Sequence, residues 1–566
     1  MKWRHRLLAG LFVAGAAALV ARVGHLAVAE SDFLKKQGEA RSVRVVPIPV
    51  HRGIIYDRQG EPLAVSTPVY SVWTDPGRTP IPPARYGDLA AALELPAGRL
   101  SRLLERNADS RFAYLKRHVD PATAERVRAL DIAGVRFRRE YRRFYPAAET
   151  TAHVVGMTNI DDEGQEGVEL ALDAFLRGTP GEKRVLRDRN GRPVKDLAYL
   201  RAPEFGKDVM LSLDLRLQFF AYSELKSAVE HNRAKSGALV MLDVATGEVL
   251  AMANQPSYNP NNPVDRGSPG MRNRAVTDTY EPGSTIKPLS VLAALESGRY
   301  FPDTPVDTAP GYFRIGSKLI EDPSNRGRLT LAQVLAKSSQ VGITKVALDL
   351  PDHAIFDVVA RAGLGEVPGT HLPGETVGVF TSRDLDKDIG RATLAFGYGL
   401  TVTPLQLART YLTLATGGVR RPVGIIRDAP APPSERVFDA RDVRDVSRMM
   451  ERVASTEGTA PLARVAGYRI VGKTGTTRKV SPAGYDDSRH VALFAGYGPA
   501  QAPRIVVVVV IDEPMAGPVG GGSVAAPVFS RVVARALRIL GVPPEDSRAI
   551  AGAAPPRDEA EPAPHP

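Results

Sequence analysis

Cysteine is absent from the 566-residue sequence, and this absence excludes three kinds of chemistry. Without cysteine the chain forms no disulfide, uses no thiol nucleophile and builds no zinc site with cysteine ligands. Such a composition suits a protein that is exported to an oxidising compartment.

Long runs of basic residues are also absent, although the net charge is +11 and the sequence pI is about 9.6. A positive net charge attracts anionic partners, which include nucleic acids, lipid headgroups and cell-wall polymers. Here the Lys and Arg residues are scattered, and no nucleic-acid-binding motif accompanies them. The sequence therefore argues against binding to nucleic acid.

Long apolar runs are rare, and the one that occurs lies at the N-terminus. Residues 7–21 are apolar, follow the basic segment MKWRHR, and continue past Arg22 to residue 29. A membrane-spanning helix needs about 20 residues. A cleaved signal peptide is the alternative, because Ala27-Val28-Ala29 resembles a cleavage site. The length favours residues 1–29 as a retained anchor of the cytoplasmic membrane, with the N-terminus inside and the remainder exported.

Three stretches after the anchor carry no catalytic pattern. Residues 30–50 are polar and predict a stalk, and residues 43–205 form an irregular α+β module rich in Arg, Asp, Gly and Pro. Residues 541–566 consist mainly of Pro, Ala and acidic residues, which predicts a disordered tail. Chemistry is therefore expected between residues 206 and 540.

Strand patterns lie at both ends of residues 206–540. A strand and a long amphipathic helix are predicted within 209–230, followed by a hairpin over 237–253 that turns at Thr246-Gly247. Two further strands are predicted at 490–497 and 504–512, and the apolar run 506–510 indicates burial on both faces. Helical patterns fill much of 284–417. We therefore expect one sheet, built from N-terminal and C-terminal strands and covered by helices.

Two kinds of short motif each occur twice. Ser-x-x-Lys occurs at Ser284–Lys287 and at Ser223–Lys226, and Lys-Ser/Thr-Gly occurs at residues 473–475 and 235–237. A serine acyltransferase of the Ser-x-x-Lys type also needs a polar serine between these two motifs. Only the series Ser284, then residues 338–340 (Ser-Ser-Gln), then residues 473–475 supplies it, at separations of 54 and 189 residues.

The first motif has residue types that suit nucleophilic chemistry. Residues i and i+3 of a helix share a face, so Lys287 can reach the Ser284 hydroxyl. A buried lysine loses proton affinity and can act as a base. At a helix N-terminus the Ser284 N–H is free to face an oxyanion. The alternative is a helix cap, but a capping box would place Glu or Gln where Lys287 stands.

The last motif, Lys473-Thr474-Gly475-Thr476, precedes the two C-terminal strand patterns. Lys473 supplies positive charge for a carboxylate, and the threonines supply hydroxyl and N–H groups. Gly475 is expected to let a substrate backbone approach closely. A solvent-facing turn before a strand is the structural alternative.

Five further segments, at residues 52–66, 143–159, 164–170, 271–288 and 396–408, accompany these motifs. With them the chain resembles class B penicillin-binding proteins, the membrane-anchored DD-transpeptidases that cross-link peptidoglycan. Its Gly397-Tyr398-Gly399 is most similar to the division branch, the penicillin-binding protein 3 type. The resemblance implies an α+β fold with a single transmembrane helix, an elongated pedestal over 30–205, and a transpeptidase domain over 206–540 whose central antiparallel sheet is covered by helices.

The resemblance also implies roles for the motif residues. Ser284 would attack the carbonyl between the two terminal D-alanines of a stem peptide, Lys287 would take its proton, and Ser338 would relay it. Lys473, Thr474 and Thr476 would hold the substrate carboxylate beside Gly475. An amine of a neighbouring stem would close the cross-link, beta-lactams would acylate the same serine, and no metal or organic cofactor would be needed.

Gln340 is the one departure, because the family has Asn at this position. Gln keeps the amide but adds one methylene, which bears on rate, substrate preference and beta-lactam affinity. The resemblance implies an FtsW-type polymerase and other division proteins as partners, and Arg22 and His25 suit an anchor that contacts another helix. A weakened division scaffold is the alternative function. A beta-lactamase is disfavoured, since the chain has an anchor and no Leu-Asn dipeptide for a class A deacylating loop.

Overall fold

The computed structural model describes residues 2–32, 42–187, 193–382, 384–481 and 484–545. Residues 33–41 of the predicted stalk and 546–566 of the predicted tail lie outside the described residues. The chain forms two compact units, each assembled from separate segments. One contains Met1–Gly53, Pro68–Arg142 and Ala174–Lys207, and the other contains Ile54–Thr67, Arg143–Asp173 and Asp208–Pro566.

The first unit begins with helix α1 (Lys2–Val28), which is long and apolar enough to span a membrane. None of its described side chains is buried. Near its C-terminal end, Arg22 NH1 and His25 Nε2 lie 3.6 and 3.3 Å from the same oxygen of Glu30. This carboxylate offers both groups a partner within the chain, and the predicted contact with another protein's helix stays a prediction.

The remainder of the first unit consists of short helices and two sheets. Its strands are β1 (Val43–Ile48), β4 (Ala113–Val119), β5 (Val135–Phe144), β8 (Gly181–Arg187) and β9 (Pro193–Arg201), and β3 (Pro62–Thr74) extends into the second unit. Its helices include α3 (Tyr86–Ala92), α4 (Ala97–Arg106) and α5 (Pro121–Ala129). One sheet has the order β1-β8-β9. A small core with Leu89, Leu100 and Val127 lies between the helices and the β3-β4 pair.

The second unit contains a five-stranded sheet in the order β12-β11-β21-β20-β19. Its strands are β11 (Ser236–Asp243), β12 (Val249–Gln255), β19 (Val471–Ser481), β20 (Gly484–Gly498) and β21 (Ile505–Asp512). Every neighbouring pair is antiparallel, and the N-terminal hairpin joins the C-terminal strands through β11 and β21. This confirms the predicted sheet, including the burial of every residue of β21.

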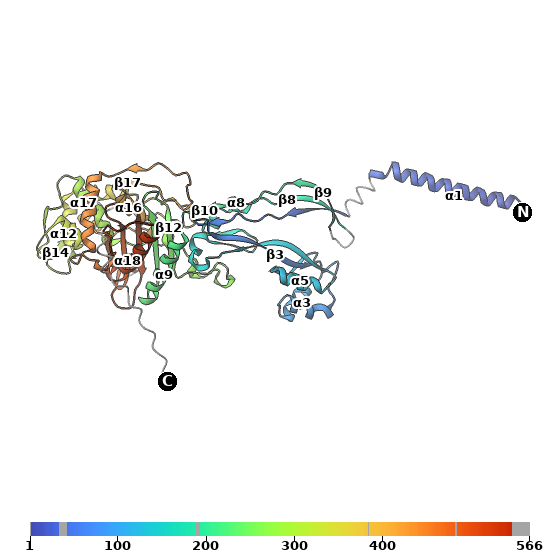
Figure 1. Ribbon diagram of the computed structural model, residues 1–566, viewed down its shortest axis with the longest axis horizontal. Helices are drawn as coiled ribbons and strands as arrows, with labels where there is room; N and C mark the ends of the chain where they lie inside the picture. The colour runs from blue at the N-terminus through green and yellow to red at the C-terminus, as the bar shows by residue number, and fades with distance from the viewer. Residues whose placement is uncertain (1, 33–41, 188–192, 383, 482–483, 546–566) are drawn as a thin grey trace, which may run out of the picture. The chain divides into compact units, whose positions relative to one another are not determined.

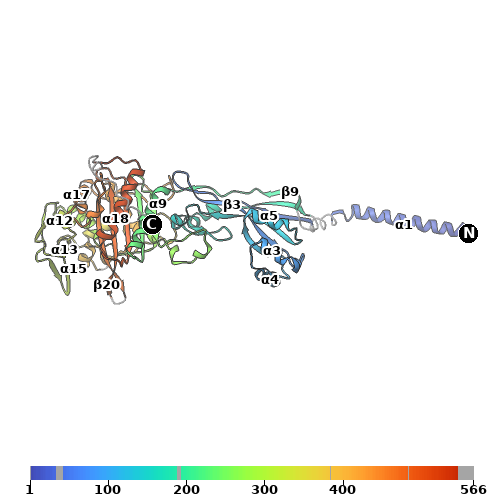
Figure 2. The ribbon, with the colours of Figure 1, turned by 60° about the horizontal axis from the view of Figure 1, so that its bottom comes forward.

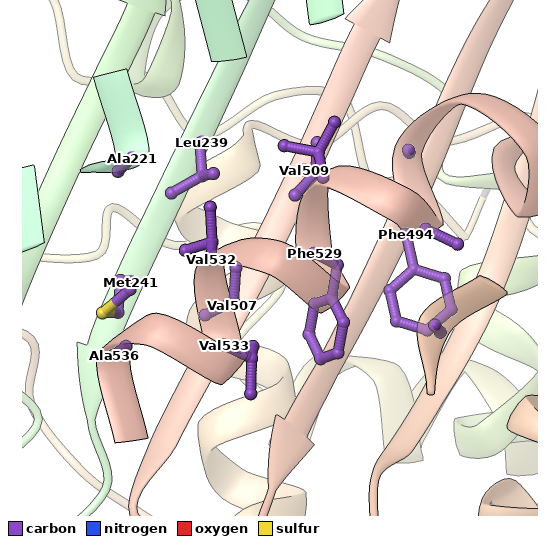
Figure 3. Close-up of a cluster of buried hydrophobic side chains, with 14 of the residues drawn as sticks. Ala221, Leu239, Met241, Phe494, Val507, Val509, Phe529, Val532, Val533 and Ala536 are labelled. Carbon is purple, nitrogen blue, oxygen red and sulfur yellow. The ribbon is translucent and has the colours of Figure 1, made fainter. Parts of the chain in front are cut away.

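Helices α9 (Leu215–His231) and α18 (Gly521–Ile539) cover one face of this sheet. Figure 3 shows Phe529, Val532 and Val533 of α18 packed on side chains from β11, β20 and β21. The Phe494 and Phe529 ring centroids are 4.6 Å apart. Burial of such side chains is worth about 1.5–3 kcal/mol each, so this layer holds the strands in place.

The second unit contains further helices between its N-terminal and C-terminal strands (Figures 1 and 2). They include α10 (Arg274–Thr277), α11 (Lys287–Glu296), α12 (Leu331–Ala336), α13 (Gln340–Asp349), α14 (Ala354–Arg361), α15 (Asp388–Ala395), α16 (Pro404–Ala415) and α17 (Ala440–Glu451). Helix α16 contacts β11, β20 and β21, and all of its residues are buried. Two small hairpin-like pairs, β13 (Pro305–Asp307) with β16 (Arg328–Thr330) and β14 (Tyr312–Ile315) with β15 (Lys318–Glu321), interrupt the predicted helical stretch.

Candidate active site

The segment that carries Ser284 is a short 3₁₀ turn, η5 (Gly283–Ile286), which runs directly into α11. Gly283 has a φ of +54°, which favours glycine, and its N–H donates to the Gly397 carbonyl at 2.9 Å. The Thr285 carbonyl accepts a hydrogen bond from the buried Tyr411 hydroxyl at 2.9 Å. Ser284 is partly exposed between buried neighbours, so the turn presents this one side chain.

The geometry excludes the helix-cap alternative for Ser284. Pro282 precedes η5 and Ile286 precedes α11 at the cap positions, and neither makes a side-chain cap bond. Within the described residues the Ser284 N–H and Oγ have no hydrogen-bond partner. The sequence predicted an α-helix at Ser284, but the structure has a 3₁₀ turn there. In a 3₁₀ turn residues i and i+3 lie above each other, so Ser284 and Lys287 still share a face.

Lys287 is the first residue of α11 and has no exposed surface. Its Nζ donates to the Ser338 carbonyl at 2.7 Å and lies 3.3 Å from Ser338 Oγ. Burial lowers the pKa of Lys287 to about 7, Asp322 partly opposes this shift, and Arg326 adds to it. The amine is therefore available in its neutral form near neutral pH.

Ser338 lies in the tight connection between α12 and α13 and has a φ of +57°. Lys473 Nζ donates to Ser338 Oγ at 2.9 Å, so two lysines from distant parts of the chain meet at one hydroxyl. A serine in the left-handed region costs on the order of 1–3 kcal/mol, and such strain gathers at functional sites. The structure thus brings Lys287, Ser338 and Lys473 together.

Lys473 lies on the buried part of β19 and has no exposed surface. Burial, followed by the nearby charge of Lys287, holds the pKa of Lys473 well below its ordinary value. Two buried ammonium groups at one hydroxyl repel each other. A negatively charged ligand beside Lys473 would relieve this repulsion and favour its charged form.

Gln340 is the first residue of α13, and its backbone N–H donates to Asp322 Oδ1 at 2.6 Å. Its side-chain amide has no hydrogen-bond partner in the described part of the chain. The structure therefore places Gln340 beside the cluster but does not bring its amide to Lys287.

Asp322 is a residue that sequence reasoning missed. This nearly buried carboxylate accepts the N–H groups of Gln340 and Val341 and the hydroxyl of Ser339. It thereby fixes the loop that carries Ser338 to the segment after β15. No motif marks it, because it lies in an irregular Glu-Asp-Pro turn that owes its role to the fold.

The three residues after Lys473 differ in exposure. Thr474 is mostly buried, and its hydroxyl lies 2.8 Å from that of Thr459. Thr476 is exposed, and its Oγ1 accepts the Gly521 N–H at 3.0 Å. A Cβ on Gly475 would lie 2.9 Å from the Pro282 carbonyl oxygen. The glycine is thus needed for the approach of β19 to the segment that carries Ser284, and its predicted role in substrate approach stays a prediction.

Glu281 is a second residue that the sequence did not single out as chemical. Its Oε1 accepts the Gly399 N–H at 2.9 Å and the Tyr485 hydroxyl at 3.0 Å. Burial raises the pKa of the Glu281 carboxyl. These bonds tie the segment before Ser284 to the 397–399 loop and to β20.

The duplicate motifs have structural roles. Lys226 of α9 lies 3.4 Å from Glu149, and Ser223 is a partly buried residue in the middle of that helix. Lys235 lies 3.3 Å from Glu513, and the Ser236 hydroxyl donates to Asp512. Neither pair belongs to the cluster around Ser338, which agrees with the order argument from the sequence. Among the described residues, no three His, Asp or Glu side chains are grouped to hold a metal ion.

Two family models match the chain. The penicillin-binding protein dimerisation domain matches residues 47–211, and the penicillin binding protein transpeptidase domain matches residues 237–534. Peptidoglycan D,D-transpeptidase FtsI of Escherichia coli K12 is 44% identical over 550 residues, covering 96% of this chain and 93% of the relative. The probable peptidoglycan D,D-transpeptidase PbpC of Pseudomonas aeruginosa is 41% identical over 552 residues, covering 97% and 98%.

Solved structures agree with this relationship. Penicillin-binding protein 3 of Mycobacterium tuberculosis is 27% identical with a TM-score of 0.67, covering 88% of this chain and 98% of that chain. The transpeptidase domain of penicillin-binding protein 3 from Burkholderia pseudomallei is 41% identical with a TM-score of 0.54, covering 59% and 98%. The resemblance expected from the motifs is confirmed: the chain belongs to the penicillin-binding proteins of the division type and carries their dimerisation and transpeptidase domains.

Proposed function

We propose that the chain is a serine-type peptidoglycan D,D-transpeptidase that acts through an acyl-enzyme on Ser284. The relatives named above are peptidoglycan D,D-transpeptidases, and the transpeptidase domain covers residues 237–534. The single observation that carries the roles is the meeting of Lys287 and Lys473 at the Ser338 hydroxyl. The proposed base, proton relay and carboxylate-binding lysine thus meet at one hydroxyl, and Ser284 lies on the turn that leads directly into Lys287.

In the acylation step, Ser284 Oγ attacks the carbonyl carbon between the two terminal D-alanines. Lys287 accepts the hydroxyl proton, since burial keeps part of its amine neutral. The N–H groups of Ser284 and Thr476 stabilise the oxyanion. Ser338 passes a proton to the amide nitrogen, the C–N bond breaks, and D-alanine leaves.

Substrate is held at the other end of the cluster. Lys473, Thr474 and Thr476 bind the terminal carboxylate, and Gly475 keeps β19 close to the nucleophile turn. The charge of the carboxylate restores the protonated state of Lys473. Gln340 contributes to binding of the substrate amide, after a rotation of its unpartnered side chain.

In the second step, an amine of a neighbouring stem peptide attacks the ester and releases Ser284, which closes the cross-link. Beta-lactams acylate the same serine. The Mycobacterium tuberculosis relative is described in complexes with aztreonam and with ampicillin, which supports this extension to the present chain.

The anchor helix and the relatives support a membrane location. Helix α1 holds the protein in the cytoplasmic membrane by a single pass, with the N-terminus in the cytoplasm and the catalytic domain outside. Residues 30–205 serve as stalk and pedestal, 206–540 as the transpeptidase domain, and 541–566 as the tail. An FtsW-type polymerase and other division proteins are the partners, and septal peptidoglycan is the product.

The test is the intact mass of the full chain after exposure to a fluorescent penicillin. We expect one stable adduct, its loss in Ser284→Ala, and its retention in Ser223→Ala, which removes the serine of the duplicate motif. We also expect faster acylation in Gln340→Asn. If the parent forms no adduct and Gln340→Asn does, the alternative of a weakened division scaffold replaces the proposal.

A further inference from the structure

A polar pocket of about 440 Å³ lies beside the catalytic cluster. Its polar lining residues are Ser324, Arg326, Lys337, Glu457 and Thr459. We call it the exit pocket. None of these residues takes part in the acylation steps described above.

The exit pocket adjoins the proposed carboxylate site through two of its lining residues. Lys337 directly precedes Ser338, and the Thr459 hydroxyl lies 2.8 Å from the hydroxyl of Thr474. Thr474 Oγ1 in turn lies 3.4 Å from Lys473 Nζ. A group that leaves the carboxylate site past Thr474 therefore enters the exit pocket.

The charges in the exit pocket have both signs. Arg326 donates to the Lys337 carbonyl at 2.6 Å, which holds its guanidinium in the lining. The Lys337 ammonium and the Glu457 carboxylate have no ion-pair partner in the part of the chain that the structure describes. The lining thus combines two cations with one free carboxylate, which suits a small zwitterion better than a simple anion.

We propose that the exit pocket binds the D-alanine released when Ser284 is acylated. This inference rests on the proposed function. The carboxylate of D-alanine pairs with Lys337 and Arg326, and its ammonium pairs with Glu457. D-alanine is a zwitterion, so its two charges match those of the pocket lining. It is also released beside Thr474, next to the pocket. The pocket is larger than alanine requires, and water fills the remainder.

The experiment supplies D-alanine separately from acylation. A thioester donor acylates the full chain and releases a thiol acid in place of D-alanine, so all D-alanine in the reaction is the amino acid that was added. The D-alanine ammonium first gives one proton to the neutral Lys287 amine, and its nitrogen bonds to the acyl carbon. The ester bond to Ser284 Oγ then breaks, and a second proton passes from the nitrogen to that oxygen. The measured quantity is the D-alanine concentration that gives half-maximal formation of this peptide.

Removing either charge should weaken binding. Lys337→Met and Glu457→Gln should each raise the half-saturating D-alanine concentration roughly tenfold, as expected for loss of one charge-assisted hydrogen bond. Lys337→Arg keeps the charge, so its half-saturating D-alanine concentration should stay close to that of the parent. Lys318→Met removes an exposed cation elsewhere in the same unit and should leave the concentration unchanged.

Penicillin acylation of each protein shows whether its site is folded, and a variant that fails this check is replaced by Lys337→Gln or Glu457→Ala. A parent without an adduct would refute the proposed function itself. An adduct with an unchanged D-alanine concentration in both charge variants would overturn the exit pocket alone. A shift in the Lys337 variant but not in the Glu457 variant would also overturn it, since that pattern describes an anion site.

Discussion

The five-stranded sheet of the second unit and strand β9 of the three-stranded sheet in the first unit differ in burial. All eight residues of β11 and all eight of β21 are buried in the second unit, whereas residues 194–201 of β9 in the first unit are all exposed. A sheet with helices on both faces is fixed by side-chain packing as well as by its backbone bonds. A sheet with open faces depends mostly on the backbone bonds. A side chain that must be held in one position, as Lys473 is, is therefore expected in a sheet that is packed on both faces.

The candidate site lies where the continuous run of buried residues on β19 ends. Its first five residues, up to Gly475, are buried, and Thr476 is exposed. Lys473 is thus desolvated, while Thr476, which the proposed function assigns to substrate binding, is exposed. This arrangement explains how one strand can both lower the pKa of a lysine and bind a ligand.

The largest effect is expected from removing a side chain of α18 that packs on the buried sheet. Phe529→Ala should lower the free energy of unfolding by about 3–5 kcal/mol, because it leaves a cavity against Phe494 and β20. Thermal loss of penicillin acylation by the full chain measures the change. Phe529→Leu should lose much less, and a loss below about 1 kcal/mol in Phe529→Ala would contradict the role given to this layer.

Desolvation of the lysine pair predicts a pH dependence. The pKa of Lys287 is about 7, and only the neutral amine accepts the Ser284 proton. The acylation rate should therefore fall about tenfold per pH unit below pH 7 and level off above it. The groups that shape this titration are Lys473, Asp322 and Arg326. A rate that stays flat between pH 5.5 and 7 would show that Lys287 is not the base.

Much of this architecture could be predicted from local sequence. The apolar run 506–510 identified β21, and the order of Ser284, Ser338 and Lys473 separated the working motifs from their duplicates. Helix α9 followed from its amphipathic pattern. These features depend on periodicity and order, which a single sequence displays directly.

Other features depend on contacts between distant segments. Asp322 and Glu281 acquire their roles only when the 322 turn meets α13 and the 397–399 loop meets η5. Gly475 was predicted as a substrate contact, and its close approach to Pro282, which the fold requires, could not be read from the sequence. Each unit is assembled from separate segments of the chain, and no local sequence pattern indicates this assembly.

A smaller effect on acylation is expected from a change at Asp322, the carboxylate that holds the loop carrying Ser338. Asp322→Asn replaces one acceptor oxygen with a donor facing Ser339 Oγ or the N–H groups of Gln340 and Val341. Acylation should slow about tenfold, as expected when a buried hydrogen-bond partner is lost. The carboxylate raises the pKa of Lys287, so its removal should also move the pH limb to lower pH. Glu321→Gln, an exposed neighbour, should change neither quantity.

The smallest effect belongs to the open sheet. Leu197 of β9 is 45% exposed, so Leu197→Ala leaves no cavity and should change the free energy of unfolding by no more than about 0.5 kcal/mol. The measurement is the same thermal assay used for Phe529→Ala, combined with limited proteolysis of the first unit. If Leu197→Ala lowered the free energy of unfolding of the full chain by more than about 1 kcal/mol, side-chain packing would stabilise β9 as it stabilises β21. The contrast between the two sheets would then be wrong.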